Sequence, residues 1–310
     1  MRAKVVVGSR GSELALRQAQ LVVAELQKHF PEVDFKIKTI KTAGDKILDL
    51  PLPKLEGKGF FVKEIEHALL AGEIDMAVHS MKDVPTVLPA GLTLSAITKR
   101  EDARDCYLAQ DGKTGLFDSP PKARIGTSSL RRAAQILARR PDLEIVPIRG
   151  NLNTRLRKLT EMDLAGIVLA YAGVSRLGWT DKITEIIETD KILPAVGQGA
   201  LGIETRQGDT EIINMVKTLH DSLAAAAVVA ERAFLRTLEG GCQTPIAAWG
   251  RVEKDQLVLE GMVGDLRGEK ILRRQVSGAI NQAEALGRKL AQMLLQEGAA
   301  ALIEQVRREY

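Results

Sequence analysis

The chain has 310 residues, of which 45% are hydrophobic and 27% are charged, and these values predict a globular protein of two or three domains. The formal net charge of +4 would suit nucleic acid, but only 4% of the residues are aromatic, too few for base-stacking surfaces, and no zinc-finger or RNP-like motif is present. A nucleic-acid partner is therefore not expected, and a small polyanion is the better predicted ligand.

The N-terminal segment and the cysteines indicate the compartment. Residues 1–18 contain only a short apolar run before Gly8, too short for a signal peptide or a membrane span, so we expect a cytoplasmic protein that does not enter a membrane. Cys106 and Cys242 would form at most one disulfide, which a reducing compartment disfavours. Four histidines without metal-ligand spacing predict no metal site.

Strands and helices alternate through the first two thirds of the chain. Hydrophobic patterns predict strands at 3–7, 35–40 and 74–80 and helices within 8–30 and 61–72. The same alternation restarts after residue 102 and runs through 123–140, 144–159 and 165–178. Two such runs predict two α/β domains, each with a largely parallel, buried sheet.

The last third has a different pattern. An alanine-rich helix at 221–238 precedes three short strands, predicted as antiparallel, and a long helix that closes the chain, at 245–253, 256–265, 270–278 and 281–298. This order predicts an α+β domain with a helix over a small sheet. Residues 41–59, with several prolines and glycines, predict a long loop or lid.

A candidate anion site lies where a strand meets a helix. Thr127, Ser128 and Ser129 precede the helix, where free backbone amides and the helix dipole attract an anion. An ordinary N-cap by one of the hydroxyls is the alternative. Arg131 and Arg132 favour the anion, because cations in a first helical turn oppose the dipole and need another reason to be there.

Further arginines follow the predicted strands. Arg10 follows the first strand, Arg149 precedes Gly150 after another, Arg155 lies one turn into the next helix, and Arg176 is predicted at the end of a further strand. Each alone would be a solvated surface residue. Because the carboxyl ends of strands in open α/β sheets face the ligand crevice, together they predict a cleft that binds carboxylates.

Residues 75–85 hold the densest group of polar side chains. We predict a hydrogen-bonded structural role for His79. Asp83, beside Lys82, is either an ordinary turn or capping residue or a carboxylate that stabilises positive charge on a reacting group in the same cleft. Cys106 alternates as a strand core residue does, which predicts a structural role.

Cys242 lies in the stretch LEGGCQTP, after two glycines and shortly before a proline. These neighbours predict a turn whose backbone closely approaches another group. A cysteine kept for packing, by contrast, normally lies in an apolar strand or helix. The surroundings favour chemistry at this thiol.

Seven segments, in order along nearly the full chain, resemble the porphobilinogen deaminase family, also called hydroxymethylbilane synthases. They are GSRGSELALRQ, GKGFFVKEIE, DMAVHSMKDVP, IGTSSLRRAAQ, IRGNLNTRL, LPAVGQGALGIE and ERAFLRTLEGGCQTPI. The departures from the family pattern, at Thr237, at Thr244 and in the C-terminal helix, touch no residue to which we assign chemistry.

The resemblance implies that Cys242 carries a dipyrromethane cofactor through a thioether, a task that suits a nucleophilic thiolate. It implies that four porphobilinogen units are added to this primer with loss of ammonia, and that hydroxymethylbilane is released by hydrolysis for tetrapyrrole biosynthesis. Uroporphyrinogen-III synthase would be the partner that receives the product.

The resemblance also implies roles for single residues. Asp83 would stabilise the azafulvene cation formed as ammonia leaves. Gln198, at the domain junction, would join the cofactor site, and Phe61 would pack either near the reacting rings or in the core. The side chains expected to contact cofactor or substrate carboxylates are Arg10, Ser12, Lys82, Thr127, Ser128, Ser129, Arg131, Arg132, Arg149, Arg155 and Arg176.

The family's fold implies two domains resembling periplasmic binding proteins and a C-terminal domain with a three-stranded antiparallel sheet. The expected boundaries are 1–98 with 199–218, then 99–198, then 219–310, and a monomer is expected. The competing hypothesis is a non-catalytic bilobal protein that captures a carboxylate-rich ligand. Such a protein has no need for a thiol on a Gly-Gly turn.

Overall fold

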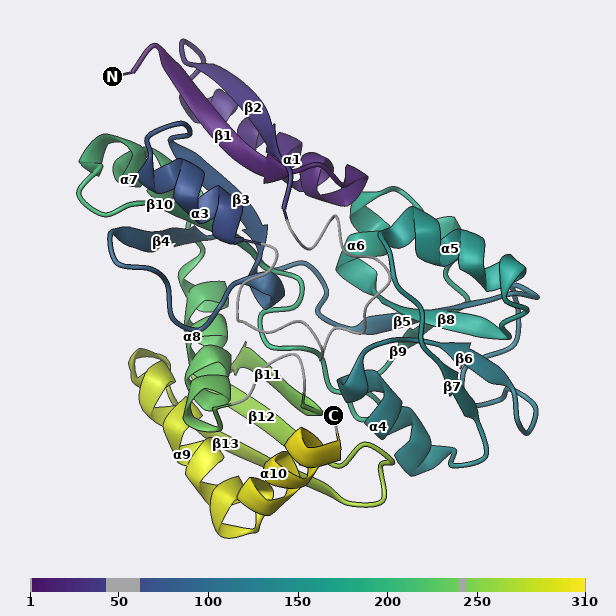
Figure 1. Cartoon of the computed structure of the whole chain (residues 1–310). Coiled ribbons are helices and arrows are strands. Elements are labelled where there is room, and N and C mark those ends of the chain that lie inside the picture. Colours follow the sequence, from purple (N-terminus) through teal and green to yellow (C-terminus); the bar gives the residue numbers. More distant parts are fainter. Residues whose placement is uncertain (1, 43–61, 240–243, 310) are drawn as a thin grey trace. The chain divides into compact units, whose positions relative to one another are not determined.

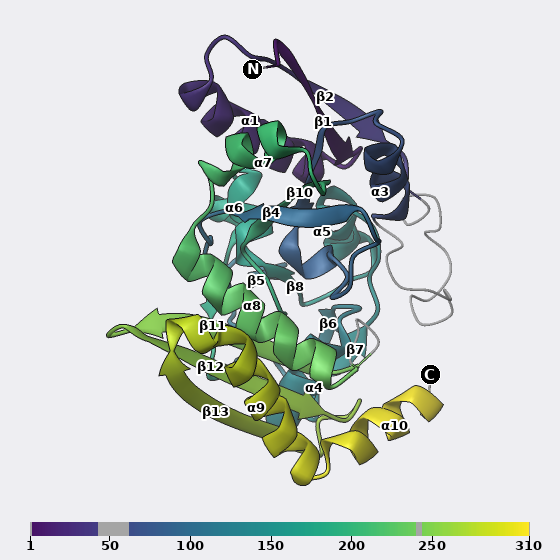
Figure 2. The same cartoon turned by 90° about the vertical axis from the view of Figure 1, so that its left-hand side faces the viewer.

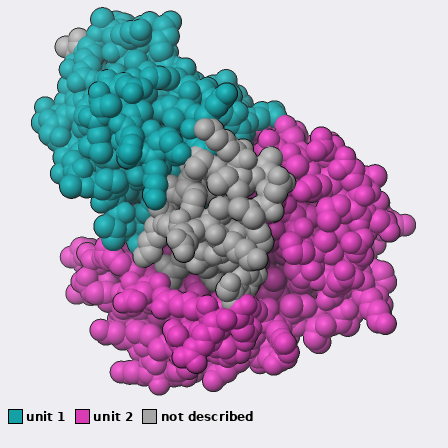
Figure 3. Space-filling view, in the orientation of Figure 1, with its two compact units in different colours: residues 1–51, 55–101, 200–225 teal, residues 52–54, 102–199, 226–310 magenta. Residues whose placement is uncertain are grey.

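The computed structural model describes residues 2–42, 62–239 and 244–309. The described residues form two compact units, coloured separately in Figure 3: unit 1 contains 2–42, 62–101 and 200–225, and unit 2 contains 102–199, 226–239 and 244–309. Residues 226–309, predicted as most of a third domain, thus fall in one unit with residues 102–199. The three predicted domain boundaries stay a prediction.

Unit 1 is built on a sheet that has five strands in its described part, in the order β2-β1-β3-β10-β4 (Figure 1). β1, β2 and β3 run parallel, and β10 pairs antiparallel with both β3 and β4. The strands are β1 (Lys4–Arg10), β2 (Asp34–Ile40), β3 (Met76–Ser80), β4 (Leu92–Ile97) and β10 (Leu201–Arg206).

Helices cover both faces of this sheet because its central strands are apolar on both sides. Val7 and Val78 pack with α1 (Glu13–His29) and α7 (Thr210–Lys217) on one face. Ala77 packs with α3 (Lys63–Leu70) on the other. A 3₁₀ turn, η2 (Met81–Asp83), directly follows β3.

The first sheet of unit 2 has the strand order β7-β6-β8-β5-β9 among the described residues. β7, β6 and β8 are parallel, whereas β5 runs antiparallel to β8 and β9. The strands are β5 (Asp105–Ala109), β6 (Arg124–Gly126), β7 (Glu144–Val146), β8 (Gly166–Ala170) and β9 (Glu185–Ile187). The helical segments are α4 (Leu130–Arg139), α5 (Leu152–Glu161), α6 (Tyr171–Arg176) and η3 (Thr180–Lys182).

The second sheet of unit 2 is an antiparallel meander of β11 (Ile246–Glu253), β12 (Gln256–Gly264) and β13 (Ile271–Ala279). Helix α9 lies across it, next to α8 (Figure 2). A Cβ atom at Gly287 would lie 2.2 Å from the Ala230 carbonyl oxygen, so only glycine lets these helices approach so closely. The helical segments here are α8 (Ser222–Thr237), η4 (Ile280–Gln282), α9 (Ala283–Gln296) and α10 (Ala299–Glu309).

The two sheets of unit 2 are joined by specific contacts. Arg273 on β13 donates to the carbonyl oxygens of Thr189 and Asp190, both at 2.8 Å. Gly268, between β12 and β13, touches α4 so closely that a Cβ atom would lie 2.2 Å from the Ala134 carbonyl oxygen. These contacts explain why residues 226–309 belong to the same compact unit as the second α/β sheet.

The structure confirms two largely parallel α/β sheets and a three-stranded antiparallel sheet, and it corrects two details. The last predicted helix ends at Gln296, because Gly298 has a left-handed backbone with φ 100°, and α10 follows it. Arg176 does not end a strand: β8 stops at Ala170, and Arg176 is the last residue of α6. The predicted loop at 41–59 lies almost wholly outside the described residues.

Among the described helices, none alone is both long and apolar enough to cross a membrane. One pair, α7 with α8, satisfies the length and composition test together but is bent by 109°. No group of three or more His, Cys, Asp or Glu side chains in the described ranges is placed to hold a metal ion.

Candidate active site

One edge of the first unit 2 sheet gathers most of the predicted site residues. β7, β6 and β8 are parallel and end at this edge. β5 runs the other way and begins there, because Asp105 is paired with Ala170, the last residue of β8. In open α/β sheets this edge is where ligands bind. The antiparallel strand therefore brings a carboxylate to an edge that the sequence predicted to be lined with arginines.

Asp105 binds the two arginines of the first turn of α4. Arg131 Nη1 donates to Asp105 Oδ2 at 2.7 Å, and Arg132 Nη2 donates to Asp105 Oδ1 at 2.8 Å. The Asp105 side chain is fully buried, and each arginine side chain is 6% exposed. The Asp105 carboxylate explains why Arg131 and Arg132 lie in the first turn of α4, where the helix dipole disfavours positive charge.

Two guanidinium groups face one carboxylate in this cluster, so its formal charge is positive. Although burial opposes ionisation, the charges of Arg131 and Arg132 hold the pKa of Asp105 well below its ordinary value. Arg132 Nε is buried and has no hydrogen-bond partner within the described residues. A buried cation with an unused donor calls for a further anion.

Gln198 joins the same carboxylate from the loop before β10. Its Nε2 donates to Asp105 Oδ1 at 2.8 Å and to the Ala103 carbonyl oxygen at 2.7 Å. The structure thus brings together Arg131, Arg132 and Gln198, three predicted site residues, around an aspartate that sequence reasoning missed. The available signal was an acidic residue at the head of the apolar run DCYLA.

The Thr127 to Ser129 loop leaves the start of α4 without a side-chain cap. Ser128 Oγ donates to the Ile148 carbonyl oxygen at 2.6 Å, and Thr127 Oγ1 accepts from the Ser129 amide at 3.2 Å. Ser129 is the N-cap residue but makes no side-chain capping bond. The alternative of an ordinary N-cap by one of these hydroxyls is therefore wrong in this structure.

The remaining unit 2 arginines lie after the same strand ends. Arg149 follows β7, and its Nη1 is buried without a partner among the described residues. Arg155 Nε donates to the Gly150 carbonyl oxygen at 2.9 Å, and Arg176 Nη2 donates to the Gly199 carbonyl oxygen at 2.6 Å. These carbonyl bonds orient the two guanidinium groups near the strand ends.

In unit 1, the predicted residues follow two parallel strands. Arg10 ends β1, and Ser80 ends β3 two residues before Lys82 and three before Asp83. Asp83 is exposed, and among the described residues its carboxylate makes no hydrogen bond or ion pair. It ends the 3₁₀ turn η2, as the turn alternative expects, and its side chain caps no described helix. Ser12, by contrast, caps α1 by accepting from the Ala15 amide at 3.3 Å.

Two structural predictions are confirmed. His79 Nε2 lies 3.0 Å from Glu204 Oε2 with both side chains buried, and Cys106 is fully buried in β5. Two predicted site residues, Phe61 and Cys242, lie outside the described residues.

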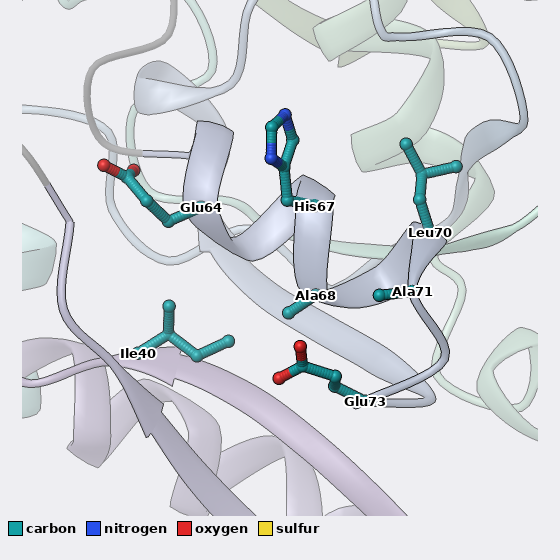
Figure 4. Close-up of a pocket in the computed structure, with 7 residues that line it drawn as sticks. All are labelled: Ile40, Glu64, His67, Ala68, Leu70, Ala71 and Glu73. Carbon is teal, nitrogen blue, oxygen red and sulfur yellow. The ribbon is translucent and has the colours of Figure 1, made fainter.

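A hollow of about 640 Å³ lies beside α3, next to the end of β2 (Figure 4). It is lined by Ile40, Glu64, His67, Ala68, Leu70, Ala71 and Glu73. None of these is a predicted site residue, so the candidate site rests on the strand ends instead.

Comparison with known families identifies the family to which the chain belongs. Residues 5–214 match the family description "Porphobilinogen deaminase, dipyromethane cofactor binding domain", and residues 225–296 match "Porphobilinogen deaminase, C-terminal domain". The chain belongs to the porphobilinogen deaminase family. Porphobilinogen deaminases are transferases of tetrapyrrole biosynthesis, so this chain is an enzyme of that class with a dipyrromethane cofactor. A non-catalytic binding protein is not better supported.

Named relatives align over nearly their whole length. The porphobilinogen deaminase of Carboxydothermus hydrogenoformans is 53% identical over 100% of this chain and 99% of its own length. Those of Chlorobaculum tepidum and Desulforudis audaxviator are 50% and 51% identical, and each alignment covers 99% of both chains.

Solved structures with weaker likeness are periplasmic proteins. The VFT2 domain of Bordetella pertussis BvgS, as a double mutant, is 18% identical with a TM-score of 0.41, covering 70% of this chain and 85% of that domain. The aliphatic sulphonate binding protein SsuA of Escherichia coli is 13% identical with a TM-score of 0.41, covering 77% and 71%.

Proposed function

We propose that the strand-end arginines of unit 2 hold the carboxylates of the dipyrromethane cofactor and of the growing pyrrole chain, and that Asp83 of unit 1 stabilises the reacting porphobilinogen. The observation that carries the proposal is the excess positive charge of the buried Asp105, Arg131 and Arg132 cluster at this edge of the unit 2 sheet. Each porphobilinogen carries an acetate and a propionate, so every added unit brings two more negative charges. A polycarboxylate chain therefore matches this edge in charge.

The residues at this edge fit the cofactor. Arg132 Nε and Arg149 Nη1 are buried donors without partners in the described structure, and the start of α4 has no side-chain cap. Carboxylates satisfy such donors through charge-assisted hydrogen bonds. When bound, the dipyrromethane supplies the pyrrole end to which porphobilinogen is joined. Cys242 would attach it through a thioether, which does not hydrolyse readily. The cofactor would be held by Cys242, Lys82, Asp83, Thr127, Ser128, Ser129, Arg131, Arg132, Arg155 and Gln198.

Substrate binding would use the other residues at the strand ends. Arg149 and Arg176, with Arg155 shared, would receive the acetate and propionate of incoming porphobilinogen. In unit 1, Arg10 and Ser12 would do the same, and Phe61 would pack near the reacting rings. Asp83 suits charge stabilisation because its carboxylate is exposed and is not neutralised by any described neighbour. As ammonia leaves porphobilinogen, positive charge develops on the ring, and a nearby carboxylate lowers the energy of that state.

The compartment, the oligomeric state and the partner of the enzyme are inferred from the same chemistry. A thiol that must attack a cofactor precursor has to stay reduced, which supports action in the cytoplasm. We infer that the enzyme is a monomer and hands hydroxymethylbilane to uroporphyrinogen-III synthase, since the released chain must then be closed to a ring. Cell fractionation, light scattering and co-sedimentation with that synthase test these three inferences.

Intact mass tests the attachment point. The purified chain should exceed its sequence mass by one dipyrromethane, and peptide mapping should place the excess on Cys242. Cys242→Ser should lack both the excess mass and turnover, whereas the control Cys106→Ala, in the buried strand β5, should keep both. An unmodified wild-type chain with full activity would contradict the proposal.

Asp83→Asn tests the catalytic assignment, because it keeps the shape of the side chain and removes its charge. Single-turnover release of ammonia should fall on the order of 100- to 1000-fold, equivalent to about 3 to 4 kcal/mol. Cofactor loading must first be confirmed by mass, because the same carboxylate helps to hold the primer. The matched control is Asp34→Asn, an exposed carboxylate on β2. Ammonia release at the wild-type rate from loaded Asp83→Asn would return Asp83 to the role of a turn residue.

A further inference from the structure

Unit 1 contains a buried group of three titratable side chains that the reaction does not use. His79 lies on β3, Glu204 on β10 and Glu66 on α3. His79 Nε2 is 3.0 Å from Glu204 Oε2, and the two side chains are 3% and 1% exposed. Glu66 as a whole is 5% exposed. We call these three residues the acidic cluster.

The sheet register brings the acidic cluster together beneath α3. Glu204 is opposite Ala77 in the ladder, and Ala77 and His79 project from the same face of β3 because side chains alternate along a strand. Helix α3 covers this face. Glu66 is buried together with Ile65 and Leu69, so it belongs to the side of α3 that packs on the sheet.

The acidic cluster holds more acid than base. One imidazole faces two carboxylates, and both Glu66 Oε1 and Glu204 Oε1 are buried without a hydrogen-bond partner in the described part of the chain. Two unpartnered carboxylates in one core are costly. One proton on Glu66 removes the like charge and creates an O–H donor. Burial, and then the charge of Glu204, raise the pKa of Glu66 above its ordinary value, against the opposing effects of His79, His67 and Lys63.

The end of β3 leads directly to the 3₁₀ turn η2, which carries Lys82 and Asp83. His79 pairs with Gly202 in the ladder, and Met81 donates its amide to the Ala200 carbonyl oxygen at 3.0 Å. The Met81 side chain packs against Gly202 so closely that a Cβ atom there would lie 2.3 Å from Met81 Sδ. The 3₁₀ turn that carries Lys82 and Asp83 therefore starts one residue after a strand end bound to the acidic cluster.

We propose that Glu66, His79 and Glu204 are positioning residues: the buried Glu66 is the member of the acidic cluster that takes up a proton, while the His79–Glu204 pair holds the end of β3 and, through it, the turn that carries Lys82 and Asp83. The proposal rests on the proposed function only for the role of Asp83.

The pH dependence of unfolding tests the proton on Glu66. A carboxyl whose pKa is raised on folding contributes stability that is complete below its unfolded pKa and is lost as pH rises through the folded pKa. Relative to Glu66→Gln, which is neutral at every pH, the wild-type folding equilibrium constant should therefore fall as pH rises, by at most about tenfold per pH unit. The groups that face Glu66 and shape this curve are Glu204, His79, His67 and Lys63.

Infrared difference spectroscopy tests the same proton directly. The band of a protonated carboxyl group should persist in the wild-type chain to a higher pH than that of an exposed glutamate, and it should be lost in Glu66→Gln. Glu73→Gln is the matched control, because Glu73 lies just after α3 but is exposed and paired with Lys38. An unchanged band in Glu66→Gln, or parallel stability curves for wild type and Glu66→Gln, would overturn the proposal.

The positioning claim has its own test in Glu204→Gln, which removes the charge that binds His79. We expect a fall in kcat on the order of tenfold with KM changed less than about twofold, since a displaced catalytic group slows chemistry more than binding. Hydrogen exchange of the peptide over residues 81–85 should quicken in Glu204→Gln and stay unchanged in Glu73→Gln.

Unchanged exchange and unchanged kcat in Glu204→Gln would overturn the positioning role. If Glu204→Gln does not fold, Glu66→Gln decides the question, because it keeps the shape of the protonated side chain and should fold and keep kcat; a tenfold loss of kcat there would contradict the proposed proton on Glu66. Failure of the proposed function would look different, because Asp83→Asn would then be fully active while the exchange and infrared results stayed as expected.

Discussion

The two α/β sheets each bury a charged cluster near the strand ends that carry predicted site residues, and the clusters are opposite in sign. In unit 2, one carboxylate, Asp105, faces two guanidinium groups. In unit 1, one imidazole, His79, lies with two carboxylates. Within the described residues, the first cluster has excess positive charge and one donor without a partner, and the second has excess acid and two acceptors without partners.

This difference shows two ways to manage unbalanced charge in a core. A guanidinium cannot lose its proton at accessible pH, so we propose that the excess in unit 2 is balanced by anions that arrive with the ligand. A carboxyl group can take up a proton, so we propose that the excess in unit 1 is balanced within the acidic cluster. In this proposal the unit 2 cluster binds ligand, and the unit 1 cluster positions the turn after β3.

The largest expected effect comes from breaking the unit 2 cluster with Asp105→Asn. Two buried guanidinium groups would lose their carboxylate, which costs about 3 to 5 kcal/mol of unfolding free energy. Urea denaturation measures the loss, and intact mass should show less dipyrromethane bound. Asp181→Asn, whose side chain is 74% exposed, should match wild type in both. A stable Asp105→Asn with full loading would show that the arginines need no internal counter-ion.

A smaller effect separates guanidinium groups with and without an internal partner. Arg149→Leu removes a cation that pairs with no described carboxylate, so its unfolding free energy should stay within about 0.5 kcal/mol of wild type. Its kcat/KM for porphobilinogen should fall by an amount equivalent to about 1.5 to 3 kcal/mol. Arg132→Leu should lower both quantities, because it also strips Asp105 of a donor. Equal stability losses in the two variants would erase the distinction.

A further contrast between the two clusters lies in the pH dependence of their stabilisation. Asp105 has a lowered pKa, so its stabilisation is present above the unfolded value of 3.8 and is lost only as pH falls through the lower folded value. From about pH 5 to about pH 8, the stability gap between wild type and Asp105→Asn should stay constant. Over the same range, the gap between wild type and Glu66→Gln should change by at most about 1.4 kcal/mol per pH unit. If both stability gaps changed with pH in the same way, the proposed difference between the two clusters would be wrong.

Much of the fold was predictable because its signals are local. Apolar patterns predicted β1, β2 and β3, strands in the runs that contain β6, β7 and β8, and the antiparallel meander, and the buried strand position of Cys106 followed from the same pattern. β4, β9 and β10 were not predicted. The break between α9 and α10 at Gly298 and the short helix that ends at Arg176 were not predicted. A short helix after a strand repeats the apolar run of the strand, so periodicity alone does not separate them.

The candidate site was predictable in its residue types and less so in its partners. Arginines after strand ends, and the hydroxyl-rich loop before α4, were visible because their position relative to a strand is a local property. Asp105 was not, since its role depends on an antiparallel strand that starts at the edge where parallel neighbours end. His79 was predicted to be structural, but Glu66 and Glu204 were not linked to it.

The sequence by itself determined the alternation of strands and helices, the cationic character of the strand-end loops, the reactive setting of Cys242 and the family resemblance, because each is written in neighbouring residues. Only the tertiary structure decided which charges meet. Asp105 is 26 residues from Arg131, and His79 is 125 residues from Glu204. Contacts over such separations depend on strand order and register, which no local pattern specifies, and burial then sets the energy of each unbalanced charge.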